Sequence, residues 1–285
     1  MAESRFVRGQ TQGGAEWQIH YQVYGNGPDM VMLHGGGPGA TGASNYSKNV
    51  ETLSKHYRCW VIDFPGWGQS SKNLNAFGAE GPFQNGSRAV LAFMDAMGIA
   101  KTHLVGNSFG GSAALCLAMD HPERVNRLVL MGPGGGVVAQ AKGPTNGIKQ
   151  LLTYYLGDGP SLEKLQTFIQ NLVFDQSLIT AALLQQRFDA SNDPEIRANP
   201  PLVLVPGVAP GKETFISLDP RLAVLPHRTL FVWGLQDQVN PVAGLEPFKV
   251  IPHADHLLLT HCGHWAQWEH PDRFNDAVLS FLRNP

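Results

Sequence analysis

The chain has 285 residues, and its 21 Lys and Arg against 23 Asp and Glu give a formal net charge of −2. This balance creates no overall field that would attract nucleic acid or an anionic membrane surface, so we expect a small-molecule partner. The longest apolar runs, at residues 30–33 and 202–205, fall far short of the roughly 20 residues of a membrane-crossing helix. The length suffices for one large domain, with or without an inserted subdomain.

The N-terminus and the cysteines bear on compartment and cofactors. The first ten residues lack the apolar stretch and cleavage site of a secretory signal, which predicts a cytoplasmic protein. Cys59, Cys116 and Cys262 form no CxxC pair, so we expect buried thiols. The histidines show neither HExxH spacing nor a carboxylate-rich cluster, and we predict no metal and no other cofactor.

Apolar runs bounded by glycine or proline predict strands in the first half of the chain. Residues 18–24 alternate in character and end at a Gly-Asn-Gly-Pro turn. Further strands are predicted at residues 30–33, 59–62, 103–105 and 128–131, with a helix at residues 109–121. Strands separated by helical stretches predict an α/β fold with a mostly parallel central sheet and helices on both faces.

The pattern changes between Gly132 and about Phe215, where glycine-rich loops lead into amphipathic stretches. These predict helices at residues 147–156, 162–174 and 178–189. Strands then resume at residues 229–233 and 256–259, and the chain ends in a predicted helix at residues 271–282. We therefore predict an α/β core of residues 1–135 and 214–285 that is interrupted by a helical cap of residues 136–213.

Residues 106–110, Gly-Asn-Ser-Phe-Gly, match the pattern GxSxG. A predicted strand precedes them and a predicted helix follows, which is the context of a serine nucleophile on a tight strand-to-helix turn. Such a turn is strained and closely packed, and Gly106 and Gly110 provide the small flanking residues that it needs. The alternative is a glycine-rich turn with an ordinary serine, but the partners of Ser108 favour a nucleophile.

A serine is a poor nucleophile at neutral pH and needs an imidazole that is oriented by a carboxylate. In the expected chain order Ser, acid, His, the acid is Asp237, which follows the predicted strand at residues 229–233. Asp219 and Asp255 are rival acids, but neither follows a strand in this way. Among the 11 histidines, His264 lies in a glycine-preceded loop between the last strand and the terminal helix. We predict Ser108, Asp237 and His264 as a catalytic triad.

Acyl-type chemistry also needs N–H donors aimed at the developing oxyanion. One predicted donor is the amide of Phe109, directly after the nucleophile, and the other is Gly36 in the run His-Gly-Gly-Gly-Pro-Gly after the strand at residues 30–33. A phosphate-binding loop is disfavoured, since no GK[ST] follows and the spacing is not GxGxxG. Residues 63–70 form another glycine-punctuated turn, which we interpret as scaffold.

With these residues the chain resembles the α/β-hydrolase superfamily over nearly its whole length, and more narrowly the meta-cleavage product hydrolases of bacterial aromatic degradation. The narrower resemblance depends on residues 34–40 (HGGGPGA), 44–46 (SNY), 106–111 (GNSFGG), Arg187 and the pair His264-Trp265. That family hydrolyses a carbon–carbon bond in 2-hydroxy-6-oxohexa-2,4-dienoates, which are products of extradiol ring cleavage.

The resemblance implies that Asn45, Asn107, Arg187 and Trp265 surround the dienoate, and that Gly36 and Phe109 form the oxyanion hole. The products would be a carboxylic acid and 2-hydroxypenta-2,4-dienoate, and the protein would be a dimer or larger homo-oligomer. One departure is Phe109, where relatives often have methionine; since only its main-chain N–H is needed, we expect an altered pocket shape rather than altered chemistry.

Physical reasoning on the reaction agrees with this resemblance. Breaking a C–C bond requires an electron sink, which a dienol that tautomerises to the keto form provides. The planar guanidinium of Arg187 suits the substrate carboxylate and 2-oxygen, and His264 would transfer protons. Alternatively, Arg187 is a solvated residue on the surface of a helix, and Trp265 and Phe109 only pack in the core.

Several alternatives stay open on the sequence alone. The same triad serves a carboxylesterase or thioesterase, cofactor-free haloperoxidase-like proteins share similar motifs, and a non-catalytic receptor can be built on the same fold. A dehalogenase or epoxide hydrolase is disfavoured, because its nucleophile would be aspartate. The sequence does not decide whether Ser108 or an activated water attacks, nor which 6-substituent is accepted. An apolar pocket for an aryl group is predicted from Trp67, Phe77, Phe168 and Phe174.

Overall fold

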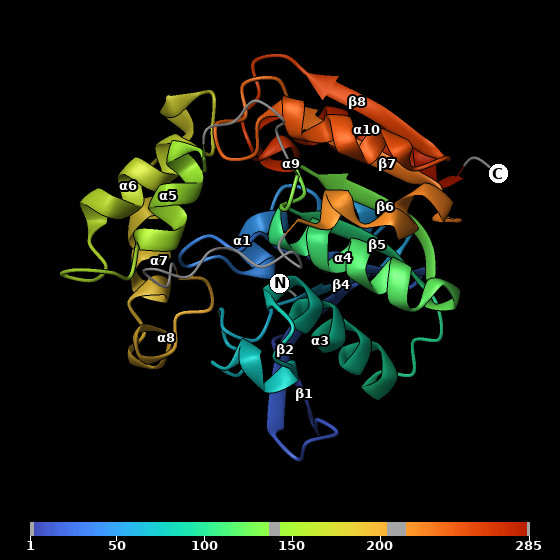
Figure 1. Cartoon of the computed structure of the whole chain (residues 1–285), viewed down its shortest axis with the longest axis horizontal. Coiled ribbons are helices and arrows are strands. Elements are labelled where there is room, and N and C mark those ends of the chain that lie inside the picture. Colours follow the sequence, from blue (N-terminus) through green and yellow to red (C-terminus); the bar gives the residue numbers. More distant parts are fainter. Residues whose placement is uncertain (1–2, 137–142, 204–214, 284–285) are drawn as a thin grey trace.

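The computed structural model describes residues 3–136, 143–203 and 215–283 (Figure 1). In these ranges an eight-stranded sheet has the strand order β1-β2-β4-β3-β5-β6-β7-β8. The first two strands and β4 pair in antiparallel fashion, and the remaining neighbours are parallel. The strands are β1 (Arg5–Gln10), β2 (Glu16–Tyr24), β3 (Asp29–Leu33), β4 (Arg58–Ile62), β5 (Thr102–Asn107), β6 (Val125–Met131), β7 (Thr229–Gly234) and β8 (Ala254–Leu259).

Helices cover both faces of the sheet because successive side chains of a strand point to opposite sides. On β3, Val31 and Leu33 join the apolar cluster beneath α3 (Pro82–Ala96) and α4 (Phe109–Asp120). Met30 and Met32 of the same strand join the cluster on the other face, with α2 (Val50–Leu53) and α10 (Pro271–Arg283). This arrangement confirms the predicted α/β fold class.

A separate group of helices lies to one side of the sheet (Figure 1). It consists of α5 (Asn146–Thr153), α6 (Leu162–Gln170), α7 (Ala181–Ser191) and α8 (Pro194–Ala198), and we call it the cap. Its apolar cluster, which includes Leu165, Phe168 and Leu172, also takes in Val239 and Trp265 from the core. The predicted boundary at residue 213 lies outside the described residues, so the cap limits stay a prediction.

The sequence missed or misplaced several elements. It gave no strand at β1, whose alternation is diluted by charged residues on an exposed edge, and no helix at α3. The predicted helix at residues 162–174 ends at Gln170, and the one at residues 178–189 begins at Ala181, where Thr180 caps its N-terminus. Among the described residues the remaining elements are α1 (Gly42–Tyr46), α9 (Ala266–Glu269) and 3-10 helices at residues 74–77, 122–124, 176–178, 216–218, 220–224 and 242–250.

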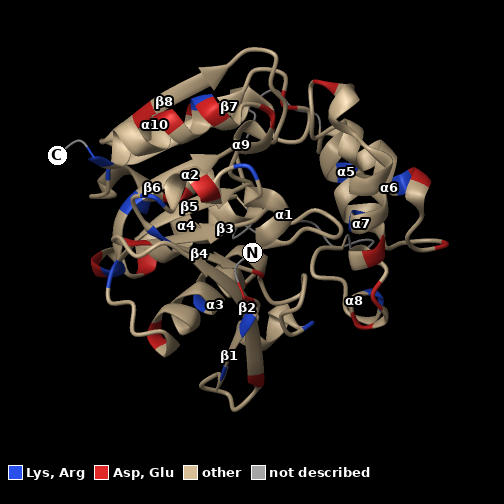
Figure 2. Cartoon of the chain, turned by 180° about the vertical axis from the view of Figure 1, so that it is seen from behind, with Lys and Arg blue, Asp and Glu red and all other residues tan. Residues whose placement is uncertain are grey.

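The surface charges and the cysteines agree with the expectations from composition. Acidic and basic residues are interspersed over the face seen in Figure 2, in keeping with the small net charge. Cys59, Cys116 and Cys262 are free and buried, which confirms the expectation of buried thiols. Across the described ranges, no helix combines the length and the apolar character that crossing a membrane requires.

Candidate active site

Ser108 lies at the junction between β5 and α4, at the carboxyl end of the parallel strands. Its backbone angles, φ 51° and ψ −112°, are rarely adopted by a residue with a side chain and mark a strained turn. The flanking glycines are required by close approach, because a Cβ on Gly106 would lie 2.5 Å from the carbonyl oxygen of Gly110. A Cβ on Gly110 would lie 2.4 Å from the carbonyl oxygen of Leu33. The strained turn therefore presents the Ser108 hydroxyl at the sheet edge.

His264 and Asp237 form a buried acid–base pair. Nδ1 of His264 lies 2.7 Å from Oδ2 of Asp237, and the two side chains are 2% and 1% exposed. The other carboxylate oxygen accepts the N–H groups of Val239 and Asn240, each at 2.8 Å. Because the carboxylate only accepts, Nδ1 must carry the proton, which leaves the lone pair of Nε2 free. This is the tautomer that a general base needs.

Ser108 and His264 line one pocket between the core and the cap. Five more of the residues singled out from the sequence line the same pocket: Gly36, Asn45, Asn107, Arg187 and Trp265. Asp237 lies behind His264 as its hydrogen-bond partner. The side chain of Phe109 packs against Phe64, Trp67 and Phe83, so only its main chain is adjacent to Ser108.

Arg187 is the charged group of this pocket. Its side chain extends from α7 and is buried, with only 3% of the residue exposed. Nε donates to the carbonyl oxygen of Pro38 at 2.8 Å, and the guanidinium lies 5.2 Å from the centre of the Trp265 ring. Within the described part of the chain no carboxylate forms an ion pair with it. Burial lowers the pKa of Arg187 from 12.5 to about 10, so it stays charged at neutral pH.

Two side-chain amides of the pocket each have a polar atom without a hydrogen-bond partner in the described structure. Nδ2 of Asn45 and Oδ1 of Asn107 are buried and make no hydrogen bond in the described structure. Buried polar atoms without a partner are uncommon in folded proteins and carry a free-energy cost. Together with Arg187 they offer unused donors and an acceptor to a polar ligand.

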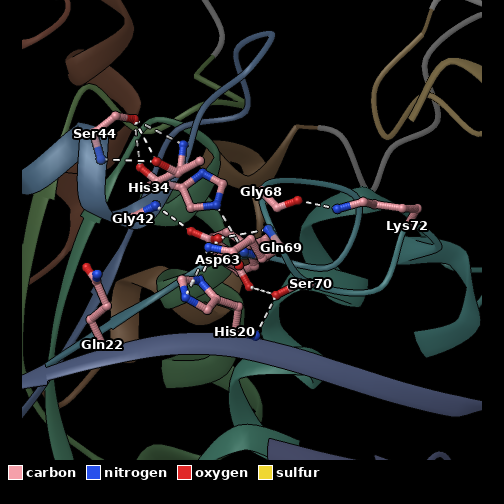
Figure 3. A network of polar contacts seen from close by, with 12 residues as sticks. His20, Gln22, His34, Gly42, Ser44, Asp63, Gly68, Gln69, Ser70 and Lys72 are labelled. Atoms are coloured by element: carbon pink, nitrogen blue, oxygen red, sulfur yellow. Dashed lines mark hydrogen bonds and ion pairs between the residues drawn. The ribbon is translucent and has the colours of Figure 1, made fainter. Parts of the chain in front are cut away.

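A buried polar network fixes the glycine-rich loop that contains Gly36 (Figure 3). His34 Nε2 accepts the N–H of Phe64 at 3.0 Å, and its Nδ1 therefore donates to the carbonyl oxygen of Gly35 at 2.7 Å. Burial lowers the pKa of His34, which keeps the ring neutral. The loop is thus attached at its start to the segment that follows β4.

Asp63 attaches the other end of that loop. Its carboxylate accepts the N–H groups of Gly42 at 2.8 Å and Gln69 at 3.0 Å, and His20 Nδ1 lies 2.8 Å away (Figure 3). Burial works against the charged form, but the contact with His20 and the other hydrogen bonds hold the pKa of Asp63 below its usual value. The turn at residues 63–70 therefore acts as a scaffold for the glycine-rich loop.

Comparison with known proteins assigns the chain to a family. The model of a family described as alpha/beta hydrolase fold matches residues 29–271. A 2-hydroxy-6-oxo-6-phenylhexa-2,4-dienoate hydrolase from Burkholderia cepacia is 41% identical over 99% of this chain and 96% of its own. A 2-hydroxy-6-oxononadienedioate/2-hydroxy-6-oxononatrienedioate hydrolase from Escherichia coli O139:H28 is 38% identical over 100% and 97%. The chain belongs to the α/β-hydrolase family.

A solved structure supports the narrower group within the α/β-hydrolases. The meta-cleavage product hydrolase from Pseudomonas fluorescens IP01, complexed with acetates, superposes with a TM-score of 0.80 at 30% identity, over 93% of this chain and 94% of its own. The resemblance to meta-cleavage product hydrolases that the motifs indicated is confirmed.

Some sequence-based interpretations of this α/β-hydrolase need correction. Of the four aromatic residues proposed for an aryl pocket, Phe168 lines the pocket, Trp67 and Phe77 lie in the buried core and do not line it, and Phe174 is 43% exposed and lines a separate surface groove. The prediction for Phe174 is wrong because the helix ends at Gln170, before this residue, and the side chain points outward. The rival acids lie elsewhere: Asp219 bonds to Arg221, and Asp255 is an exposed residue of β8.

The sequence also missed part of the site. Leu151, Leu172 and Val239 line the pocket, and they come from α5, the segment after α6 and the turn after Asp237. The apolar stripe of α5 was visible in the sequence, but which side chain faces the pocket depends on how the cap docks. For metals, the described residues contain no group of three or more His, Cys, Asp or Glu that could hold an ion.

Proposed function

We propose that this enzyme hydrolyses a carbon–carbon bond of a 2-hydroxy-6-oxohexa-2,4-dienoate with an apolar 6-substituent. The products are a carboxylic acid and 2-hydroxypenta-2,4-dienoate. The observation that carries the proposal is Arg187, a buried cation without a carboxylate partner in the described structure, in the pocket shared by Ser108 and His264. A buried charge is costly unless it is paired, so a pocket of this kind is suited to an anionic ligand.

The polar side of the pocket fits the dienoate end of such a substrate. The planar guanidinium of Arg187 can donate to a carboxylate and to the adjacent 2-oxygen. Asn45 and Asn107 contribute the unused amide atoms, and the Trp265 ring, which lies beside Arg187, flanks the conjugated chain. We propose these four residues as the substrate-binding set.

The proposed chemistry begins with ketonisation. The proton of the 2-hydroxyl leaves and C5 is protonated, so that the 2-oxo group becomes an electron sink conjugated with the C3–C4 double bond. Arg187 favours this step by stabilising negative charge on the 2-oxygen, and His264 Nε2 is the group available to move the proton.

Hydrolysis then takes place at C6. Either water attacks C6 directly, or Ser108 attacks C6 and water later hydrolyses the resulting ester; in both routes the first attack on C6 leads to breakage of the C5–C6 bond. Its electron pair passes into the dienol system, a proton returns to the 2-oxygen, and one water is consumed overall. We assign the oxyanion-stabilising N–H groups to Gly36 and Phe109, and the imidazole of His264 takes the proton of the attacking hydroxyl or water.

The 6-substituent is proposed to be neutral and apolar, as in a phenyl ketone. Leu151, Leu172 and Val239 supply apolar lining, and Arg187 is the only Lys or Arg that lines the described pocket. A second carboxylate, as in the dioate named for the Escherichia coli relative, would have no described cation to pair with. We therefore expect kcat/KM for a 6-phenyl dienoate to exceed that for a 2-hydroxy-6-oxononadienedioate by about tenfold or more.

The test uses the yellow dienoate made by extradiol cleavage of 2,3-dihydroxybiphenyl, with loss of visible absorbance as the readout. Bleaching that yields benzoate and disappears in Ser108→Ala supports the proposal. Rapid hydrolysis of p-nitrophenyl acetate without bleaching would favour a carboxylesterase. Binding of the dienoate without turnover would favour a receptor.

A cytoplasmic location and a homo-oligomeric state complete the proposal. Both rest on the sequence and the family resemblance. Sedimentation of the purified protein tests the second, and a single monomeric species at micromolar concentration would contradict it.

A further inference from the structure

A segment of the cap, residues 172–175, lies directly against the loop that contains His264. The carbonyl oxygen of Leu172 accepts the N–H groups of both His264 at 2.7 Å and Trp265 at 3.2 Å. One cap carbonyl therefore holds the backbone of the predicted base and of a pocket-lining residue. The side chain of Leu172 lines the same pocket, so a shift of this segment would disturb both the base and the lining.

Glu269, at the end of α9, joins these two segments from the other side. One carboxylate oxygen, Oε1, accepts the N–H of Gly263 at 2.7 Å, next to His264. The other, Oε2, accepts the N–H of Phe174 at 2.7 Å and has a longer contact of 3.4 Å with the N–H of Asp175. The two oxygens thus bind two segments that are about 90 residues apart in the sequence.

The carboxylate of Glu269 accepts hydrogen bonds from these amides and, at 4.0 Å, from the Cys262 thiol, rather than from a cation. In the described structure no Lys, Arg or His forms an ion pair with its carboxylate. Lys48 is close enough to be affected by its charge, but its Nζ donates to the carbonyl oxygen of Trp268 and lies over the Trp268 ring. His270 bonds through Nε2 to the carbonyl oxygen of His261.

The three segments pack closely together at Gly263. A Cβ on Gly263 would lie 2.7 Å from the carbonyl oxygen of Leu172 and 3.0 Å from both Oε1 of Glu269 and the amide nitrogen of Phe174. Only glycine allows this close approach of three segments. Burial raises the pKa of Glu269, so the fold keeps this carboxylate at a cost that its three N–H partners offset only in part.

We infer that Glu269 is a positioning residue that holds cap residues 172–175 against the His264 loop. It thereby keeps the His264 side chain and the pocket-lining residue Leu172 in the positions that catalysis requires. The inference rests on the proposed function, in which His264 moves protons in the pocket beneath the cap. Glu269 does not line the pocket that Ser108 and His264 share, and it acts through the backbone of the two segments that it joins. Its removal should therefore affect the chemical step more than global stability.

The primary variant is Glu269→Gln. Its amide has the same shape but only one acceptor oxygen, so an NH2 group must face an N–H of either the loop or the cap. We expect kcat for dienoate hydrolysis to fall about 10- to 100-fold, as expected when a catalytic group is displaced by about an ångström, with a smaller change in KM. Hydrogen exchange should rise in peptides that cover residues 172–176 and 262–266, and not in β7.

The matched control is Asn275→Ala on α10. Asn275 accepts a hydrogen bond from Asn49 behind the same short helix α9, but it contacts neither the cap segment nor the His264 loop. We expect it to lower Tm while kcat at 25 °C stays within about twofold of the wild type. If Glu269→Gln does not fold, Glu269→Asp replaces it, because the shortened carboxylate cannot reach both segments and should lower kcat in the same way.

A Glu269 variant with kcat within twofold of the wild type would overturn the inference. So would an exchange increase that is as large in β7 as at the junction, because that result means global destabilisation. A wild-type protein that leaves the dienoate unbleached contradicts the proposed function instead. In that case p-nitrophenyl acetate hydrolysis and the exchange pattern decide the role of Glu269.

Discussion

Replacing Arg187 with methionine should leave stability nearly unchanged and strongly reduce dienoate turnover. Burial lowers the pKa of Arg187 from 12.5 to about 10, and this difference corresponds to about 3 kcal/mol against the charged form in the folded protein. Methionine has a similar length and removes that penalty. It also loses the charge-assisted bond to Pro38, worth about 1.5 to 3 kcal/mol, and the cation–π contact with Trp265, worth about 1 kcal/mol. These terms nearly cancel, so Tm should stay within about 4 °C of the wild type.

The activity on the dienoate should fall much more than the stability changes. A charged hydrogen bond to the substrate carboxylate is worth about 1.5–3 kcal/mol, so kcat/KM for the dienoate should fall about 10- to 150-fold or more. Hydrolysis of p-nitrophenyl acetate, which has no carboxylate, should stay within about threefold. The control is Arg197→Met on α8, an exposed cap arginine that should leave both activities unchanged. Equal loss of both activities in Arg187→Met, or undiminished dienoate turnover, would refute the reasoning.

Two further predictions concern stability. Asp63→Asn places an NH2 group against the N–H of Gly42 or Gln69 and should lower stability by about 2 kcal/mol, or Tm by about 4 to 8 °C at pH 7; a Tm within 1 °C of the wild type in a thermal melt would contradict this. His103, on β5, has its pKa lowered to about 4 by burial and by Arg127. Because the unfolded chain binds this proton more readily, stability should decrease as the pH falls from about 6.5 to 4, by up to about 3 kcal/mol. His103→Phe keeps the ring against Tyr57 and should lack this decrease in urea titrations at the two pH values; an unchanged slope would exclude His103 as its origin.

The sequence predicts the core of the fold well because its signals are local. The GxSxG pattern between an apolar run and a helix defines the turn at Ser108 without any tertiary information. The residues after β7 and β8 could be chosen in the same way, because the carboxyl ends of parallel strands meet at one sheet edge. The structure indeed places Asp237 and His264 within hydrogen-bonding distance there.

The cap side of the pocket was harder to predict. The direction of a cap side chain depends on how the helices dock, which a periodic apolar pattern does not specify. Phe174 shows this limit, because an early helix end turns it to the surface, whereas Leu172 two residues earlier lines the pocket. Glu269 carried no signal at all, since its partners are backbone N–H groups that any sequence provides.

The most direct test of the account is the bleaching of the 2,3-dihydroxybiphenyl cleavage product by the purified wild-type protein and by Ser108→Ala under identical conditions. We predict that the wild type removes the yellow colour and releases benzoate and 2-hydroxypenta-2,4-dienoate. The rate of the variant should be lower by a factor of about 10⁴ or more. A wild-type protein that leaves this dienoate and its 6-alkyl analogues intact, or a Ser108→Ala variant that bleaches them at the wild-type rate, would contradict the account.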